Sequence, residues 1–361
     1  MPANLNFFDT YTLIAIHEEI VPRPTFLRTR YFPTGAGDLF ASDKVLTEFR
    51  DGDRKMAAFV SERIGDIPMD RRGYAIHEYQ PAFIAPSRLL SVDDLRKRGF
   101  GEAIYANSNP AQRAARLIQD DMIDLEHRIA MREEWMAAQT MINNACTMQT
   151  YVDDNTQGET LYVQFYDTTS DHIYSVGSGN RWDGSNGDIR GDVRNMCKML
   201  SNRGLPAVDL ILGTDAADCL LEDTALREKL NTTSGVLIGR IQEQLTGIEG
   251  VVFMGQLNFG GYLLNVFSVD ETYVDSSNQT QRFFPASSAM VTAPGAGHMA
   301  YGQITQIDFG SSEFATHVAA RVPKFSVDQD KDQRKLRLAT RPLAMPHNYC
   351  PWIYAADVVT P

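Results

Sequence analysis

The sequence predicts an α+β fold in which strand-rich segments flank one long helix and a compact region of alternating strands and helices. Three observations predict it: strand-like runs within residues 44–90, a stretch free of proline and glycine over 111–149, and an alternating pattern over 190–298. With 361 residues, 43% of them hydrophobic, the chain can bury a sizeable core. We find no apolar run near the ~18 residues that a membrane-spanning helix needs.

The first ~35 residues are predicted to form an N-terminal arm. Residues 11–20 fit a short amphipathic helix, and three prolines at 22, 24 and 33 then favour an extended path. The glycines at 35 and 37 end the arm. Its aromatic rings must be buried either in the core of this chain or against a neighbour in an assembly. These rings belong to Phe7, Phe8, Phe26, Tyr31 and Phe32.

Residues 41–90 are predicted to form a long β-hairpin. The best strand candidates are residues 55–62 and 74–85, and the segment between them reads RIGDIPMDRR. So polar a tip cannot lie in a core, which indicates a hairpin that protrudes or packs outside its own domain. The charged residues near its two ends, Arg54, Lys55, Asp66, Asp70, Arg71 and Arg72, could set the register between neighbouring subunits.

The strongest secondary-structure signal predicts one helix over about 108–149. It starts at Ser108-Asn109-Pro110, a capping residue and a proline suited to a first turn. Apolar residues then recur at intervals of three and four, with one gap at Arg132. Such a helix would run ~60 Å, so it is either a spine or coiled-coil strand or a helix lying across an ordinary domain.

The elements on either side of residue 190 are shorter. Before it, residues 161–166 and 172–176 are predicted as strands. The compact region is predicted to contain helices at 193–202, 216–230 and 236–245, and strands at 207–212, 251–254, 262–269, 283–284 and 289–292. The C-terminal segment returns to strands, at 303–309, 313–322 and 335–343. The compact region therefore reads as an α/β domain.

The net charge of −12 is concentrated in one region. Residues 151–310 hold 20 Asp and Glu against 9 Lys and Arg, whereas the whole chain holds 46 and 34. A protein that binds nucleic acid tightly shows a basic face instead, so tight nucleic-acid binding is disfavoured. Four cysteines at irregular spacing predict reduced thiols, and the first 21 residues lack the features of a secretory signal.

No residue set in the sequence predicts catalysis, a cofactor or a metal ion. His17-Glu18-Glu19 lacks the second histidine of a zinc protease, and Gly177-Ser178-Gly179 lacks the third glycine of a dinucleotide fingerprint. The lysine of a phosphate-binding loop and the Gly-x-Ser-x-Gly elbow of hydrolases are missing too. The aspartates at 167, 171 and 183 fit no calcium loop, and we interpret them as a solvated loop.

The order of these elements resembles one known family. The resemblance depends on three segments: an arm that ends in Phe26-Leu27-Arg28, the stretch 40–86 (FASDKVLTEF…YAIHEYQPAFIAP) and the run VDLILG at 208–213. The chain closes with RKLRLATRPLAMPHNYCPWIYAADV at 334–358, which contains Arg341-Pro342-Leu343. In these features the chain resembles the lambda-type major capsid proteins of tailed bacteriophages (the phage capsid protein E family), which have the Hong Kong 97-type capsid fold.

The resemblance implies an assignment of parts. Residues 1–40 would be the N-arm, 41–90 the extended loop, 91–152 with 299–361 the peripheral domain that holds the spine helix, 153–189 a hairpin insertion, and 190–298 the axial domain. Hexamers and pentamers of the chain would form an icosahedral shell around double-stranded DNA, without catalysis, cofactor or membrane contact. Portal, scaffolding or protease, and decoration proteins are the partners that the resemblance implies. The expected location is the virion, after assembly in the host cytoplasm.

Subunit contacts are predicted at Phe26, Phe32, Arg54, Lys55, Asp70, Arg71 and Arg72. Two alternative functions remain open. A host-encoded compartment of the encapsulin type would enclose cargo enzymes in place of DNA. An acidic α/β enzyme or carbohydrate-binding module would behave as a monomer or small oligomer with a ligand pocket.

Overall fold

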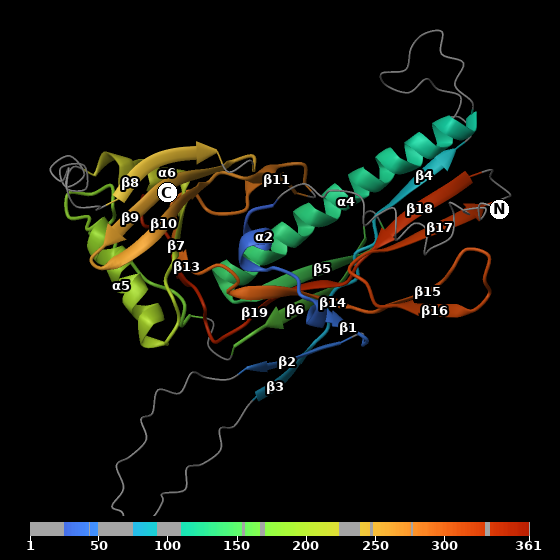
Figure 1. Cartoon of the computed structure of the whole chain (residues 1–361), viewed down its shortest axis with the longest axis horizontal. Helices are drawn as coiled ribbons and strands as arrows, with labels where there is room; N and C mark the ends of the chain where they lie inside the picture. The colour runs from blue at the N-terminus through green and yellow to red at the C-terminus, as the bar shows by residue number, and fades with distance from the viewer. Residues whose placement is uncertain are drawn as a thin grey trace, which may run out of the picture.

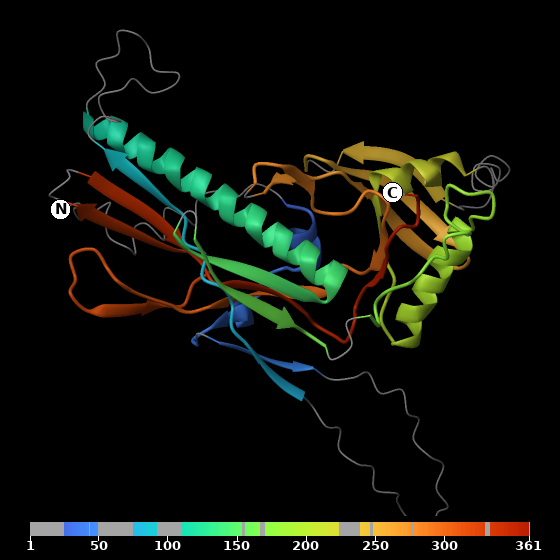
Figure 2. The same cartoon turned by 180° about the vertical axis from the view of Figure 1, so that it is seen from behind.

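The molecule consists of an elongated half and a compact half joined side by side (Figures 1 and 2). The computed structural model describes residues 25–42, 44–49, 75–91, 110–153, 156–166, 170–223, 239–245, 248–275, 277–328 and 333–360. The predicted α+β composition is confirmed, because one long helix and several separate sheets make up the elongated half, while the compact half is one mixed sheet with two helices. In the described residues, no helix has the length and apolarity needed to cross a membrane.

The compact half is built on a six-stranded sheet with the order β20-β13-β7-β10-β9-β8. The central strand β7 pairs in parallel with β10 and antiparallel with β13. The strands are β7 Asp209–Gly213, β8 Gly239–Leu245, β9 Val251–Phe259, β10 Tyr262–Val269, β13 Ala289–Thr292 and β20 Ile353–Ala355; the helices are α5 Ile189–Asn202 and α6 Thr214–Glu222. A two-stranded hairpin, β11 Thr272–Val274 with β12 Thr280–Arg282, lies beside this sheet.

Strand β7 also joins the two hydrophobic cores of the molecule. Leu210 and Leu212 pack with residues of α5 and α6, whereas Ile211 between them belongs to the core of the elongated half. Successive side chains of a strand point to opposite faces of its sheet, so one buried strand contributes to both cores. This explains why every residue of β7 is buried.

Three expectations for the compact region differ from the structure. Residues 239–245, predicted as helical, form strand β8, because pairing with β9 outweighs the helical spacing of the apolar residues. Residues 283–284 are not a strand; the strand β12 ends at Arg282, and both phenylalanine rings are buried in the core. Residues 353–355 were expected beside the spine helix. They form β20, which is an edge strand of the compact sheet. Residues 224–238 lie outside the described residues.

The elongated half is organised along the helix α4 (Pro110–Asn143), which confirms the predicted long helix. Its 34 residues span ~51 Å. The helix ends at Asn143, six residues earlier than predicted, and the next residue, Asn144, has a left-handed φ of 51°. The Asn144 side chain is fixed there, since its Oδ1 accepts from Trp352 Nε1 at 2.9 Å and its Nδ2 lies 2.8 Å from His172 Nδ1. The next residue already begins a strand.

The strands around α4 form several small sheets. A three-stranded sheet, β17-β18-β4, packs on its N-terminal part, with Phe325 and Leu336 against Met122 and Leu125. The strands are β1 Leu39–Phe40, β4 Ser87–Ser91, β14 Gly297–Gly302, β15 Ile304–Ile307, β16 Phe314–His317, β17 Val322–Asp328, β18 Gln333–Ala339 and β19 Pro342–Pro346. The predicted C-terminal strands exist, but two of them are divided: 313–322 into β16 and the start of β17, and 335–343 into β18 and β19.

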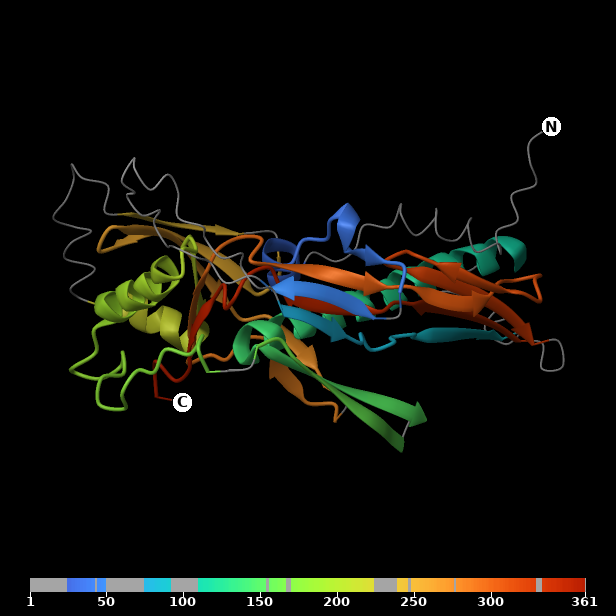
Figure 3. The same ribbon diagram turned by 90° about the horizontal axis from the view of Figure 1, so that it is seen from below.

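Two antiparallel hairpins leave the body of the elongated half. The first pairs β2 (Val45–Phe49) with β3 (Ala75–Tyr79). Of the two strands predicted for the long hairpin, 55–62 lies outside the described residues, and 74–85 forms a strand only over 75–79. The second pairs β5 (Ala145–Asp153) with β6 (Thr156–Gln164) and projects away from the layer of the other strands (Figure 3). This hairpin covers 145–164 and so overlaps the predicted insertion, 153–189, only in part. In the predicted strand 172–176, only an isolated bridge from Ile173 to Tyr354 forms.

Candidate functional site: the arm anchor

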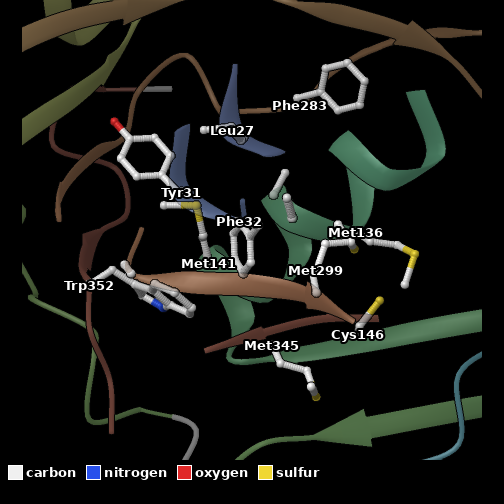
Figure 4. Packing of buried hydrophobic residues seen from close by; sticks show 14 of the residues in the cluster. Leu27, Tyr31, Phe32, Met136, Met141, Cys146, Phe283, Met299, Met345 and Trp352 are labelled. Carbon is white, nitrogen blue, oxygen red and sulfur yellow. The ribbon is translucent and has the colours of Figure 1, made fainter. Parts of the chain in front are cut away.

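The C-terminal end of the predicted arm is fixed in the middle of the molecule by a short helix, α2 (Leu27–Tyr31). Figure 4 shows Leu27, Tyr31 and Phe32 among Met136 and Met141 of α4 and Met299 of β14. Helix α2 therefore lies where α4, the compact sheet and the strand β14 meet (Figure 1). We call residues 25–32 and the side chains that bind them the arm anchor.

The rings of Phe26 and Phe32 are buried inside this chain, with exposed fractions of 3% and 1%. Phe26 packs on Phe267 at a centroid distance of 5.1 Å, and Phe32 on Trp352 at 5.8 Å. The ring of Phe32 lies so close to Gly297 that a Cβ there would be 2.5 Å from it. The structure thus corrects the expectation that these two residues contact a neighbouring subunit, because a ring already buried in its own core has no surface left to offer.

A buried carboxylate of α4 binds the start of α2. Glu134 Oε1 accepts from the Leu27 backbone N–H at 2.6 Å, and Oε2 accepts from the Arg28 N–H at 2.8 Å. These N–H groups have no partner within α2, so Glu134 acts as its cap from 106 residues away. Burial raises the pKa of Glu134 to about 7, although both hydrogen bonds favour the charged form.

The neighbouring residues of α4 form a buried ion cluster with two arginines. Arg321 pairs with Glu126 through Nε at 2.7 Å and with Glu133 through Nη1 at 2.7 Å, and each carboxylate also accepts from Nη2 at 3.0 Å. Arg28 of the arm anchor lies 3.0 Å from Glu133, and Tyr301 donates to Glu133 at 3.0 Å. Burial would raise the pKa of Glu133, but the two guanidinium groups outweigh it and lower this pKa. The arm is thereby tied to the spine helix.

A second carboxylate ties α2 to the compact half. Arg30 donates to Asp209 through Nε at 2.6 Å and Nη2 at 3.0 Å, in a bidentate pair. Tyr31 Oη and Asn265 Nδ2 also donate to this fully buried carboxylate. Burial and the neighbouring Asp209 raise the pKa of Tyr31 well above its usual value, so its hydroxyl remains a donor.

The other predicted contact residues, Arg54, Lys55, Asp70, Arg71 and Arg72, lie outside the described residues. The base of their hairpin is placed: Tyr79 of β3 is buried, packs on Phe165 and donates to its carbonyl at 3.3 Å. An exposed ion pair, Lys44 with Glu78 at 3.0 Å, joins the two strands at this base. The hairpin therefore starts from a fixed position on the body.

Sequence reasoning missed three residues that bind the arm anchor, Glu133, Glu134 and Asp209. It also missed Glu126 and Arg321, which complete the ion cluster beside it. One signal was present, because Glu126 and Glu133 lie seven residues apart on the same helical face as the apolar stripe. Acidic residues on a buried face must be paired, but a sequence does not say with what. Within the described residues, no group of three or more His, Cys, Asp or Glu side chains could hold a metal ion. The chemistry of this site is therefore to fix one segment to others.

A subunit whose arm is fixed to both of its halves, and whose hairpins project from the body, has the form of an assembly unit of a shell. The comparisons identify which kind. The model of the family "Phage major capsid protein E" matches residues 9–355, and the chain belongs to this family. It is thus a structural protein of a phage head and a component of the virion.

Individual relatives agree with this assignment. The chain is 26% identical over 272 residues to the major capsid protein of Enterobacteria phage P21, which covers 73% of this chain and 75% of that protein. The P21 prophage-derived major head protein of Escherichia coli O6:H1 (strain CFT073) matches equally. Among solved structures, a chain assigned as the capsid protein of an E. coli CFT073 prophage has a TM-score of 0.66 at 17% identity, with 96% of this chain and 98% of that chain covered. The capsid of Ralstonia phage GP4 has a TM-score of 0.51 at 9% identity, with coverages of 93% and 92%. The fold is that of phage capsid proteins.

Proposed function

We propose that this chain assembles, as hexamers and pentamers, into an icosahedral head that encloses double-stranded DNA. One observation carries the proposal: several two-stranded hairpins leave the body with large side chains exposed. Tyr151 and Tyr162 lie on the β5–β6 hairpin and Phe314 on the β15–β16 hairpin, all more than half exposed. Isolated two-stranded hairpins are marginally stable in water, so contacts with neighbouring copies are needed to bury them.

The parts would divide the work as in the Hong Kong 97-type fold. The arm, residues 1–40, and the extended hairpin, 41–90, would reach neighbouring subunits from fixed points at α2 and at the β2–β3 pair. The spine helix and its sheets would form the peripheral domain. The compact half, 190–298 with β20, would meet its copies around the symmetry axes. Residues 145–164 would form the hairpin insertion.

Assembly can be tested by expressing the chain alone and with a scaffold, followed by size-exclusion chromatography and electron microscopy. We expect closed shells or capsomer rings, and duplex DNA inside heads that assemble in infected cells. Uniform small oligomers under all these conditions would overturn the proposal. Shells that purify with a cargo enzyme in place of DNA would indicate a compartment of the encapsulin type.

A further inference from the structure

One face of the β17-β18-β4 sheet carries an unusual group of side chains. Phe325 and Leu336 point toward α4, so the residues next to them in each strand point to the opposite face. There Lys324 lies directly opposite Arg337, and Lys335 lies directly opposite Leu89. Phe83 and Arg341 complete the group, which we call the cationic patch: Phe83, Leu89, Lys324, Lys335, Arg337 and Arg341.

Three positive charges of the cationic patch, on Lys324, Lys335 and Arg337, have no ion-pair partner among the described residues. Arg337 donates through Nη2 to Gln306 at 2.9 Å, but its Nε is buried without a partner. The nearby Asp308 already binds His317 at 3.0 Å. Like charges directly opposite each other in a sheet are unfavourable. Burial and the neighbouring Arg337 lower the pKa of Lys324, although the carboxylate of Asp308 acts in the opposite direction.

Apolar side chains lie among these charges. Phe83 is 45% exposed, and the Cζ atoms of Arg337 and Arg341 lie 5.8 and 5.5 Å from the centre of its ring. Leu89 is 60% exposed. Aromatic residues and arginine are enriched at protein–protein interfaces, especially among the residues that contribute most to the binding energy. A phosphate backbone would use the charges but not the apolar surface, so these observations favour an acidic, apolar protein segment as the partner.

The same half of the chain exposes such a segment. Residues 311–314, at the turn between β15 and β16, end in Glu313 and Phe314, and we call them the hairpin tip. Both residues are exposed, Phe314 to 78%, which is the largest exposed fraction among the large hydrophobic residues described. The hairpin tip lies at the end of the elongated half that is far from the compact sheet (Figure 1). An almost fully exposed ring makes few contacts in its own chain, so its apolar surface is available to another copy.

We propose that the hairpin tip of one copy docks on the cationic patch of a second copy, with Phe314 against Phe83 and Leu89 and Glu313 paired with Lys335 and Arg337. The inference rests on the proposed assembly and names a contact within it. The two surfaces differ, so the contact is heterologous and every copy can both give and receive it. It would bury the ring of Phe314 and bring a carboxylate to Lys335 and Arg337.

Cross-linking tests the contact directly. The variant pairs Phe314→Cys with Leu89→Cys in a Cys219→Ser background, since Cys146, Cys197 and Cys350 are buried. After mild oxidation of assembled particles, we expect most chains to run as covalent dimers or larger multimers on a non-reducing gel. Each single-cysteine variant, and Phe314→Cys paired with Leu263→Cys on the compact sheet, should stay largely monomeric. Particles that assemble normally without the cross-link would overturn the contact alone.

A charge exchange provides a second readout. Glu313→Lys should lower particle yield at least tenfold, and Lys335→Glu in the same chain should restore most of it; both residues are exposed, so neither change affects folding. Failure of the double variant to recover would contradict the pairing. If duplex DNA, rather than assembly, protects the introduced thiol of Leu89→Cys from a maleimide, the cationic patch binds nucleic acid and the contact is wrong. A wild-type chain that never assembles would overturn the proposed assembly, and this contact with it.

Discussion

Replacing Arg321 with methionine should strongly destabilise the fold, because this one guanidinium neutralises two buried carboxylates of α4. Arg321 makes four contacts of 2.7–3.0 Å with Glu126 and Glu133, and all three side chains are almost inaccessible to water. Methionine keeps much of the packing volume but leaves the carboxylates without their main cation. Arg28 still pairs with Glu133 at 3.0 Å, so Glu133 keeps one cationic partner, whereas Glu126 loses the guanidinium that pairs with it.

The expected cost is about 3–5 kcal/mol in the free energy of unfolding, the range typical when one member of a buried ion pair is removed. A matched control is Arg88 of β4, which pairs with Asp124 of the same helix, but both of these side chains are more than two-fifths exposed. Arg88→Met should therefore cost no more than ~1 kcal/mol. Urea denaturation of the unassembled chain, followed by circular dichroism and tryptophan fluorescence, measures both variants.

The pH dependence provides an independent check. In the wild type, the lowered pKa of Glu133 contributes stability above its unfolded value, which is lost as the pH falls through the folded value. Without Arg321, burial raises the pKa of Glu133, so stability should instead fall as the pH rises above about 4.5. An Arg321→Met variant within ~1 kcal/mol of the wild type, with an unchanged pH profile, would refute the account of this cluster.

Three further predictions concern the arm anchor and the arm. The folded pKa of Glu134, about 7, exceeds its unfolded value, so wild-type stability should fall by about 3 kcal/mol as the pH rises from 4.5 to 7. The variant Glu134→Gln should lack this part of the pH profile. An unaltered profile in the variant would contradict the role of Glu134. Phe32→Ala should cost about 3–5 kcal/mol in urea denaturation, whereas the exposed Phe314→Ala should stay within ~0.5 kcal/mol. Removing residues 1–24 retains the arm anchor, so the free energy of unfolding should persist while particle yield by electron microscopy falls; full yield would contradict the proposed role of the arm.

The truncation shows how the structure changes an experiment that the sequence alone suggests. A deletion of residues 1–33 would remove most of the predicted arm, but it would also remove Leu27, Tyr31 and Phe32 from the core. Loss of assembly would then report a misfolded chain. A cut before Thr25 separates the two effects, because every described contact of α2 remains.

The sequence predicts the features that depend on local pattern. Helix α4 follows from a proline-free, glycine-free run with apolar residues every three or four positions, and β7, β10 and β13 follow from short apolar runs between turn residues. The segment that became β8 shows the limit, because its partner β9 decides its conformation. The arm anchor could not be predicted at all, since Glu134 binds residues more than 100 positions away. Aromatic residues in a proline-rich segment fit a core and an interface equally well, and only the packing shows that Phe26 and Phe32 belong to the core.

The distribution of charge can now be interpreted with the fold in view. The excess of acidic residues falls mainly in the compact half and the hairpin β5–β6, whereas the rest of the chain is close to neutral by count. That near-neutrality is an average over the buried pairs of α4 and the partly exposed cationic patch. In the contact that we propose, only the cationic patch faces a neighbouring copy. Buried pairs are poorly screened by salt, but exposed charges are screened within about 10 Å at 0.1 M ionic strength. Added salt should therefore weaken contacts between copies while leaving each copy folded, which makes assembly, rather than folding, the salt-sensitive step of this capsid protein.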